Sequence, residues 1–478
     1  MSKTYLCTAI PYVNGNPHIG HVMDYVLADV YARYCRECGN EVRFQVGTDE
    51  HGNKVYQKAL DSGLTVEEYA TQNSNKFRDF IAKLNVSYTD FVRTTDADHV
   101  RRCQEIWRRL KDHIYPAEYH GWYCEGCESF VTQTEYDENH GICPDHQKPY
   151  QELSERNYYL RIADFKADIR SAIENGTMQI LPEFRKQEVL KMLDNAPDIS
   201  ISRPRKELSW GVPVPDDDTQ VMYVWLDALS NYITILGYPD AENQPEFTDW
   251  WPASAQFIGK DILRFHAITW PAILLGLGLL LPKTIVSHGY VLANGQKMSK
   301  SLGNVIDPIE VLNKYGVEAL RYYFVRHVDT FADSDFTWEK YENAYNNELA
   351  NDLGNLVQRL ATLCCKNQVN GVRIDNEIND DSYHHLMQSF EFTKAIDHVW
   401  TKVQQLNKSI DEQKPWELAK QGRITEVVEV LQKLSQELLQ VAQLLQPFLP
   451  NTAERIIATF TAEEIITPPA APLFPKAK

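Results

Sequence analysis

The chain has 478 residues, which is enough for two or three domains with hydrophobic cores of their own. Its formal net charge of -18 excludes nonspecific nucleic-acid binding by the chain as a whole, so an RNA partner would need a local basic face. The apolar run 267–281 is shorter than the roughly 20 residues that span a bilayer, which predicts a buried helix and no membrane partner. Nine cysteines and a start without a secretory pattern predict a reducing cytoplasm.

The chain opens with an apolar run, residues 4–10, which predicts a short buried strand. Pro17 is then expected to open a helix, which places His18, Gly20 and His21 on its first turn. Free backbone N–H groups and the helix dipole favour phosphate at such a position. On these residues alone, an ordinary strand-to-helix turn with two surface histidines is the favoured interpretation.

A second segment changes that interpretation. Lys297-Met298-Ser299-Lys300-Ser301 lies between two glycines, which predicts a mobile loop that carries two cations. Together with His18-Ile19-Gly20-His21, it matches both signatures of the class I aminoacyl-tRNA synthetases without a substitution. The chain therefore resembles that class.

Two acidic segments follow predicted strands. The strand 41–46 leads to Asp49-Glu50-His51, at the kind of strand end where parallel α/β sheets bind ligands. A carboxylate there suits a substrate ammonium group, although a turn with a helix cap explains these residues equally well. Asp261 ends another strand and suits a ribose hydroxyl, with a helix cap as the plain alternative.

Cysteine and histidine spacing predicts one structural Zn²⁺ site. The ligands form two pairs with two-residue gaps, separated by fifteen residues: Cys124, Cys127, Cys143 and His146. Three sulfurs and one nitrogen complete a closed tetrahedron, which leaves no position for a catalytic water. Cys35 and Cys38 form a further pair, interpreted as free thiols, with pairing to one of these couples as the alternative.

Pattern changes along the chain predict its organisation. Residues 114–222 are aromatic and interrupted by prolines, which predicts an insertion into the α/β domain. After it, Trp225, Ala228 and Tyr232 recur at helical spacing, as do His266 and Trp270. Aromatic residues at such spacing usually belong to the hydrophobic core. Beside the two signature segments, however, they could line an aromatic pocket, which suits a polarizable thioether.

Beyond residue 306, apolar residues recur at helical spacing and predict a helix bundle. Asn355 and Arg359 share a helix face and could read a base edge, and Trp416 near a helix start could stack on an unpaired base. A surface pair and a half-buried tryptophan are the plain alternatives. The proline-rich residues from 467 predict a disordered tail.

The resemblance narrows to the methionyl-tRNA synthetase family, and it runs to about residue 460. It is carried by Val-Trp-Leu-Asp-Ala at 224–228, Phe-Ile-Gly-Lys-Asp at 257–261, the zinc knuckle, Asn-Leu-Val-Gln-Arg at 355–359 and Lys-Pro-Trp at 414–416. It implies ATP-dependent ligation of L-methionine to tRNA(Met), initiator tRNA included, through a methionyl-adenylate, with Mg²⁺ accompanying ATP.

The resemblance also implies residue roles. The implied methionine pocket consists of Ile10, Tyr12, Asp49, Trp225, Ala228, Tyr232 and His266. The implied ATP site consists of His18, Gly20, His21, Gly259, Asp261, His288, Val291 and Lys300. The implied catalytic residues are His18, His21, Lys297, Lys300 and Arg203, and the CAU anticodon is read by Asn355, Arg359 and Trp416.

The expected fold is α/β, with a Rossmann-like parallel-sheet catalytic domain, a zinc-knuckle insertion and an all-α anticodon-binding bundle. The expected divisions are a catalytic domain in halves 1–113 and 223–290, an insertion 114–222, a stem-contact region 291–345, a bundle 346–465 and a disordered tail 466–478. The sequence departs from many members in having His146 as fourth ligand, in carrying one ligand set, and in stopping after the bundle. The last departure predicts a monomer.

The sequence argues against three rival functions. The isoleucine, valine and leucine enzymes need a large editing insertion, whereas residues 114–222 are mostly taken up by the knuckle and its surroundings. The cysteine enzyme uses an open zinc site, whereas this ligand set is closed. A noncatalytic zinc-ribbon RNA-binding protein would keep the knuckle but would not need both signature segments intact.

Overall fold

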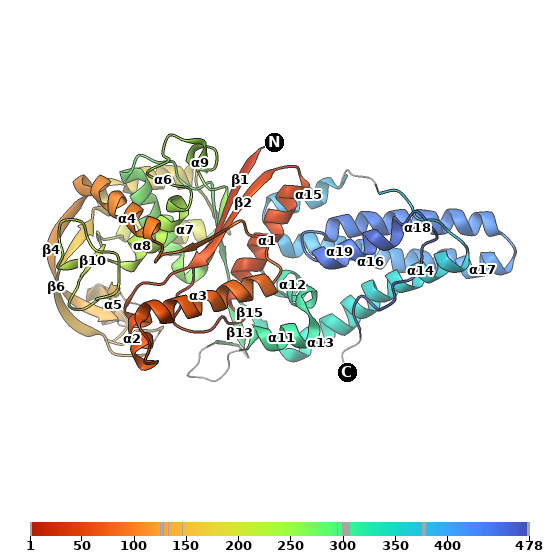
Figure 1. Ribbon diagram of the computed structural model, residues 1–478, viewed down its shortest axis with the longest axis horizontal. Helices are drawn as coiled ribbons and strands as arrows, with labels where there is room; N and C mark the ends of the chain where they lie inside the picture. The colour runs from red at the N-terminus through yellow and green to blue at the C-terminus, as the bar shows by residue number, and fades with distance from the viewer. Residues whose placement is uncertain are drawn as a thin grey trace.

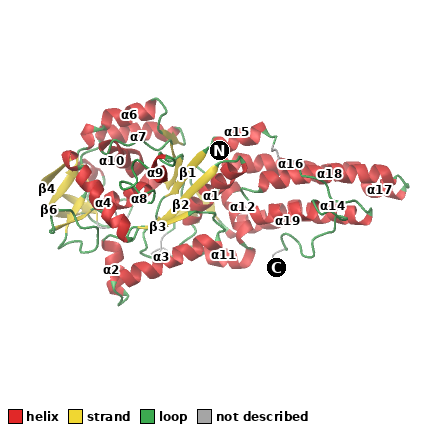
Figure 2. Cartoon of the chain, turned by 45° about the horizontal axis from the view of Figure 1, so that its top comes forward, coloured by secondary structure: helices red, strands yellow, loops and turns green. Residues whose placement is uncertain are grey.

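The structure is a computed structural model that describes residues 2–124, 126, 129–131, 133–145, 147–293, 295–298, 306–374 and 379–475. An α/β body occupies one end of the molecule and a long helix bundle the other (Figure 1). The helices of the bundle run side by side away from the sheet in a second view as well (Figure 2).

A parallel six-stranded sheet forms the centre of the body. Its spatial order is β3 (Asp90–Arg93), β2 (Glu41–Thr48), β1 (Lys3–Thr8), β11 (Ala255–Gly259), β12 (Thr284–His288) and β7 (Gln179–Leu181). Both faces are covered, since Leu6 and Phe257 pack into one hydrophobic core and Tyr5 and Ile258 into another. The strand order reverses between β1 and β11, and ligands of open α/β sheets bind outside the carboxyl ends of such a pair. The predicted parallel α/β class is confirmed.

Helices surround this sheet and continue into the insertion. They are α1 (His21–Glu37), α2 (Asn53–Asp61), α3 (Val66–Lys83), α4 (Ala97–Arg109), α5 (Gln133–Glu138), α6 (Lys166–Glu174), α7 (Phe184–Asn195), α8 (Val224–Thr234), α9 (Pro245–Thr248) and α10 (Trp270–Gly276). Short helical turns are η1 (Lys111–His113), η2 (Ile162–Asp164), η3 (Lys260–Ile262) and the π-helix η4 (Phe265–Thr269).

The insertion differs from the predicted segment 114–222. An antiparallel sheet leaves the body there, consisting of β5 (Ser129–Val131), β4 (Ile114–Cys124), β6 (Gln151–Leu160) and β8 (Ile199–Ser200). Strand β7, however, lies inside this segment and is the edge strand of the main sheet, paired in parallel with β12. Three residues are too few to show a strand period, so the sequence does not reveal that the chain returns to the sheet. The strands β9 (Ser202–Pro204) and β10 (Gln220–Met222) then form a separate pair.

A small sheet and two helices connect the body to the bundle. They are β13 (Val291–Ala293), β14 (Gln296–Lys297), β15 (Ser334–Phe336), α11 (Pro308–Tyr315) and α12 (Val317–Arg326). The bundle comprises α13 (Trp338–Asn343), the π-helix η6 (Ala344–Gly354), α14 (Asn355–Lys366), α15 (Asp381–Gln388), α16 (Phe392–Gln413), α17 (Pro415–Lys420), α18 (Ile424–Leu445) and α19 (Pro450–Phe460). The predicted apolar stripes form its core, with Leu353, Leu360, Leu431 and Leu438 fully buried.

A buried ion pair joins the body to the bundle at the centre of the molecule, where α1, α12 and α19 meet (Figure 1). Arg321 on α12 lies 2.7 Å from the Asp29 carboxylate on α1, and neither side chain is exposed. Arg321 also donates to the backbone carbonyls of Pro447 and Phe448, in the turn between α18 and α19. Burial alone would raise the pKa of Asp29, but Arg321 and Arg33 lower it below its usual value.

Replacing Arg321 with methionine is expected to lower the free energy of unfolding by about 3 kcal/mol, because a buried carboxylate then loses one of its two cations. Urea unfolding measures the change. The double variant Asp29→Asn with Arg321→Met is expected to be more stable than the single variant, since a neutral amide then replaces the buried carboxylate that has lost Arg321. A loss below about 1 kcal/mol in the single variant would contradict the importance of the pair.

The C-terminal segment 466–475 packs against the bundle, whereas the sequence predicts disorder there. Leu473 and Phe474 are buried, and the Tyr345 hydroxyl donates to the Pro475 carbonyl at 2.7 Å. Composition predicts disorder because prolines dominate locally, yet two apolar side chains join the hydrophobic core, with Phe474 packed against Tyr345 of η6, and this burial compensates for the loss of chain entropy.

Among the residues that the structure describes, no helix combines the length and the apolar character required to cross a membrane.

Candidate active site

The histidine turn lies at the strand-order reversal, between the end of β1 and the start of α1. Helix α1 begins at His21 with Gly20 at its N-cap, so His18 precedes the helix, contrary to the prediction that both histidines lie on its first turn. The carbonyl of His18 accepts from the backbone N–H of His21 at 3.0 Å.

Backbone contacts fix the protonation of the two imidazoles. Nδ1 of His21 accepts from the backbone N–H of His18 at 3.1 Å, and Nδ1 of His18 accepts from the backbone N–H of Gly20 at 3.2 Å. In both neutral rings the proton therefore lies on Nε2. The rings stack with centroids 3.8 Å apart. Burial, and secondarily His18, lowers the pKa of His21 well below its usual value, so His21 is a neutral hydrogen-bond donor.

The predicted adenosine residues meet beside this turn. His288 at the end of β12 donates from Nε2 to Asp24 on α1 at 2.9 Å and from Nδ1 to the Gly289 carbonyl at 2.8 Å. Burial alone would lower the pKa of His288, but Asp24 raises it above its usual value. Gly259 lies close to both Asp261 and His288, since a Cβ there would stand 2.7 Å from Asp261 Oδ1 and 3.8 Å from the His288 ring. No side chain larger than hydrogen fits without displacement.

The predicted thioether pocket is uncharged. The Tyr232 hydroxyl on α8 donates to His266 Nε2 at 2.8 Å, and His266 Nδ1 donates to the Ile262 carbonyl at 3.0 Å. Burial lowers the pKa of His266 to about 4, so this histidine is neutral. Trp225 stacks on Phe265 with centroids 3.7 Å apart and 7° between the planes.

Phe265 and the π-helix η4 escape the sequence reasoning. A π-helix adds a residue per turn, so Phe265 and His266 do not follow the period of an α-helix, and π-helices occur often at functional sites. The only sequence signal for Phe265 is its position as an aromatic residue directly before His266. Ala228 lies on α8 with Trp225 and Tyr232, as the helical spacing predicts.

The segments after β1 and β2 run side by side and bring Tyr12 next to Asp49. The backbone N–H of Asp49 donates to the Pro11 carbonyl at 2.9 Å, one residue after Ile10. The neighbouring carboxylate, Glu50, is fully buried. Glu50 forms a two-pronged ion pair with Arg93 at 2.7 and 2.8 Å, so its charge is already compensated.

The lysine loop starts from the same region. Val291 begins β13 three residues after His288, and Lys297 ends β14, which pairs antiparallel with β13. Lys300 lies outside the described residues. Arg203 is buried on β9, where its guanidinium lies 4.3 Å from the ring centre of Tyr223, the residue that precedes α8.

Comparison with known proteins decides the family. A family profile described as tRNA synthetases class I (M) matches residues 4–153 and 146–361. The chain is 38% identical to methionine–tRNA ligase of Thermotoga maritima, covering 97% of this chain and 76% of that protein, and 39% identical to that of Caldanaerobacter subterraneus, covering 98% and 75%.

The chain belongs to the methionyl-tRNA synthetase family of class I aminoacyl-tRNA synthetases.

Solved structures agree. Mycobacterium tuberculosis methionyl-tRNA synthetase in complex with methionyl-adenylate superposes with a TM-score of 0.90 at 33% identity, covering 99% of this chain and 100% of that one. The apo form of the same enzyme gives a TM-score of 0.83 at 30% identity, covering 100% and 99%. The α/β body and the bundle are therefore arranged in this synthetase as in that relative.

Two of the four predicted zinc ligands of this synthetase are described. Cys124 ends β4, and Cys143 lies in the turn before β6; both are buried in one small cluster with Tyr150. The Cys143 carbonyl accepts from the N–H of Gln147 at 2.8 Å, which closes a tight turn between the second pair of predicted ligands. Cys127 and His146 lie outside the described residues. Two buried sulfurs in one cluster, one beside a tight turn, fit the predicted ion.

The predicted anticodon residues of this synthetase lie on the bundle. Asn355 is exposed at the start of α14, and Arg359 one turn later forms an ion pair with Asp411 at 3.0 Å. Asp411 lies near the end of α16, and Trp416 follows on α17 at the tip farthest from the sheet (Figure 1). Trp416 is half-buried against the bundle core.

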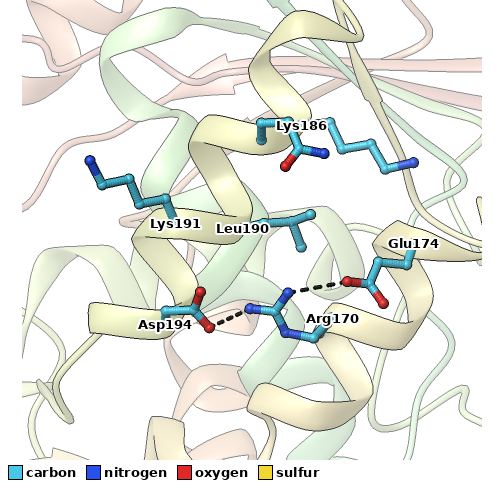
Figure 3. Close-up of a pocket in the computed structure, with 7 residues that line it drawn as sticks. Arg170, Glu174, Lys186, Leu190, Lys191 and Asp194 are labelled. Carbon is cyan, nitrogen blue, oxygen red and sulfur yellow. Dashed lines mark hydrogen bonds and ion pairs between the residues drawn. The ribbon is translucent and has the colours of Figure 1, made fainter.

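A polar pocket lies between α6 and α7, away from these residues (Figure 3). Arg170 crosses it and forms ion pairs with Glu174, at 3.1 Å, and with Asp194. The predicted site residues do not line this pocket. On α4, Arg101 and Arg102 both form ion pairs with Asp240.

Proposed function

We propose that this synthetase carries out its reaction, the ATP-dependent ligation of L-methionine to tRNA(Met), with the residues that converge at the strand-order reversal. The observation that carries the assignment is the meeting of three groups from distant segments. The Nε2–H donors of His18 and His21, the Gly259–Asp261–His288 group and the neutral Tyr232–His266 pocket adjoin the carboxyl ends of β1, β11 and β12.

In the first step the methionine carboxylate attacks the α-phosphorus of ATP, the bond to pyrophosphate breaks, and methionyl-adenylate forms. The neutral histidines donate hydrogen bonds to the phosphate oxygens as negative charge moves onto the leaving pyrophosphate. Gly20 leaves room beside them, while Lys297 and Lys300 bind the β- and γ-phosphates. Mg²⁺ bound with ATP neutralises part of the phosphate charge.

The pocket positions both substrates for this attack. Asp49 holds the methionine ammonium group, and Ile10, Tyr12, Trp225 and Ala228 surround the side chain with Tyr232 and His266. Gly259, Asp261, His288 and Val291 hold the adenosine, and Arg203 lies near the reacting carboxylate. An uncharged, aromatic environment favours a thioether over charged side chains of similar length.

In the second step the terminal ribose hydroxyl of tRNA attacks the adenylate carbonyl carbon, the mixed anhydride bond breaks, and AMP leaves. We assign initiator tRNA to the same site because both methionine tRNAs carry the CAU anticodon. The bundle 346–465 is the proposed anticodon-binding domain, with 291–345 contacting the tRNA stem. The chain is proposed to act in the cytoplasm, which its cysteine usage supports, and to act as a monomer.

The direct test is ATP–pyrophosphate exchange with each of the twenty amino acids. Methionine alone should give exchange, and tRNA(Met) should then be charged. Exchange with isoleucine, valine, leucine or cysteine instead would replace the proposed substrate, and no exchange with any amino acid would refute the enzyme assignment.

Trp416→Ala is expected to lower kcat/KM for tRNA(Met) by at least about tenfold, because base–aromatic stacking contributes about 1–3 kcal/mol. Methionine-dependent pyrophosphate exchange should stay within twofold of wild type, since α17 lies at the far tip of the bundle. Trp400→Ala is the comparison, because Trp400 is fully buried and its loss should affect stability instead. Equal losses in both assays for Trp416→Ala would assign it a structural role.

We also propose one structural Zn²⁺ ion held by Cys124, Cys127, Cys143 and His146. The purified chain is expected to contain one zinc per molecule, and Cys143→Ala should lose it, as measured by elemental analysis. Chelation should lower the midpoint of thermal unfolding even without substrates. Zinc that persists at one equivalent in Cys143→Ala would contradict this ligand set.

A further inference from the structure

Four buried polar side chains behind the methionine pocket have no role in the mechanism above. His51, His99, Cys103 and Asp227 come from the loop after β2 and from helices α4 and α8, and each is at most 5% exposed. Such a group is costly to bury unless its members are bonded to one another.

Asp227 is the centre of this group. Its Oδ2 accepts from His51 Nδ1 at 2.7 Å, and its Oδ1 accepts from His99 Nε2 at 2.8 Å. His99 continues through Nδ1 to the Thr234 hydroxyl at 2.7 Å, so α4 holds α8 at two points seven residues apart. Burial alone would raise the pKa of Asp227, but His51 and His99 lower it to about 2, which keeps it ionised.

Asp227 does not face the pocket. Trp225 and Ala228 lie three residues apart on one face of α8, and at 3.6 residues per turn Asp227 projects from another face. Its two bonds therefore fix the backbone that carries Trp225 and Ala228 without contacting methionine.

The other end of the link is the segment that carries Asp49. His51 follows two residues later, and its ring packs edge-on against Trp210, whose Nε1 donates to the Glu50 carbonyl at 2.6 Å. With Glu50 also paired to Arg93, the backbone on the carboxyl side of Asp49 is held rigidly. Gln45 bonds to Asn231 at 2.7 Å and forms a second link between β2 and α8.

We propose that Asp227 is a positioning residue that sets the span of the methionine pocket, from the ammonium site at Asp49 to the aromatic wall at Trp225, and thereby its selectivity for side-chain length. This inference rests on the proposed methionine site. A directional, charge-assisted link holds that span more tightly than apolar packing does, because both hydrogen bonds constrain distance and angle.

The test uses pyrophosphate exchange by the full chain with methionine, with ethionine (one methylene longer) and with varied ATP. Asp227→Asn and His51→Ala are expected to raise KM for methionine about tenfold and to lower the preference for methionine over ethionine about tenfold, with KM for ATP within twofold. His51→Asn should restore both values, because its amide N–H stands near the position of Nδ1.

Val189→Ala is the matched control, since Val189 is fully buried on α7 in the same core and should lower thermal stability while leaving selectivity unchanged. If Asp227→Asn does not fold, the His51 pair decides alone. Unchanged selectivity in His51→Ala, or parallel changes for methionine and ATP, would overturn the proposal. So would loss of one bound zinc in Cys103→Ser, which would make the group a metal site. A wild-type chain without methionine exchange would refute the proposed function itself.

Discussion

Methionine-dependent pyrophosphate exchange is expected to fall by at least about 100-fold when His21 is replaced by alanine, the usual effect of removing one donor that acts on transition-state charge. The physical reason is the fixed Nε2–H donor that the turn presents to the phosphates. Because His21 is neutral, alanine removes a hydrogen bond and not a positive charge.

His21→Gln distinguishes the loss of a hydrogen-bond donor from the loss of a positive charge. Its amide places a donor near the position of Nε2 and should recover about tenfold of the loss. The exchange rate should also show no titration of His21 between pH 6 and 8, since its pKa lies well below 6.5 in the folded chain and it stays neutral across that range. Exposed His385→Ala should behave as wild type. Full activity in His21→Ala would remove the turn from the mechanism.

Lys300→Ala is the second large effect, with at least about a 100-fold loss in the rate of adenylate formation. A lysine that contacts the departing pyrophosphate stabilises the transition state more than the bound amino acid, so affinity for methionine should change less than twofold. Pre-steady-state adenylate formation measures the first quantity and equilibrium dialysis the second.

Lys191→Ala, at an exposed position on α7, is the matched control for loss of one positive charge. It should leave both quantities unchanged. If Lys300→Ala instead weakens methionine binding as strongly as it slows the chemistry, the residue belongs to the amino-acid site.

The sequence predicts those elements whose hydrophobic pattern is complete within a short window. About ten residues are enough to recognise the apolar strands β1 and β2, the helical spacing of α8 and the leucine stripes of the bundle. Strand β7 does not, because its membership of the sheet depends on pairing with β12, about one hundred residues away. Likewise, the burial of Leu473 and Phe474 in the core cannot be predicted from local composition, because it depends on residues far away in the chain.

In the candidate site, too, some features could be predicted from the sequence and others depend on contacts between distant segments. Residue types and strand ends indicated Asp49, Asp261 and the two histidines, but not the ion pair that the adjacent Glu50 forms. Its partner is Arg93, which comes from a different strand. The π-helix that places His266 opposite Tyr232, and the contact between His288 and Asp24, join segments far apart in the chain. The roles of individual residues came from the family resemblance, and the geometry supplied their protonation.

The most direct measurement is a structure of this synthetase with a nonhydrolysable ATP analogue and methionine. The Nε2 atoms of His18 and His21 and the Nζ of Lys300 are expected to lie within about 3 Å of phosphate oxygens, on opposite sides of one triphosphate. An analogue bound with its triphosphate away from the histidine turn, or residues 297–301 out of reach of the triphosphate, would contradict the proposed mechanism.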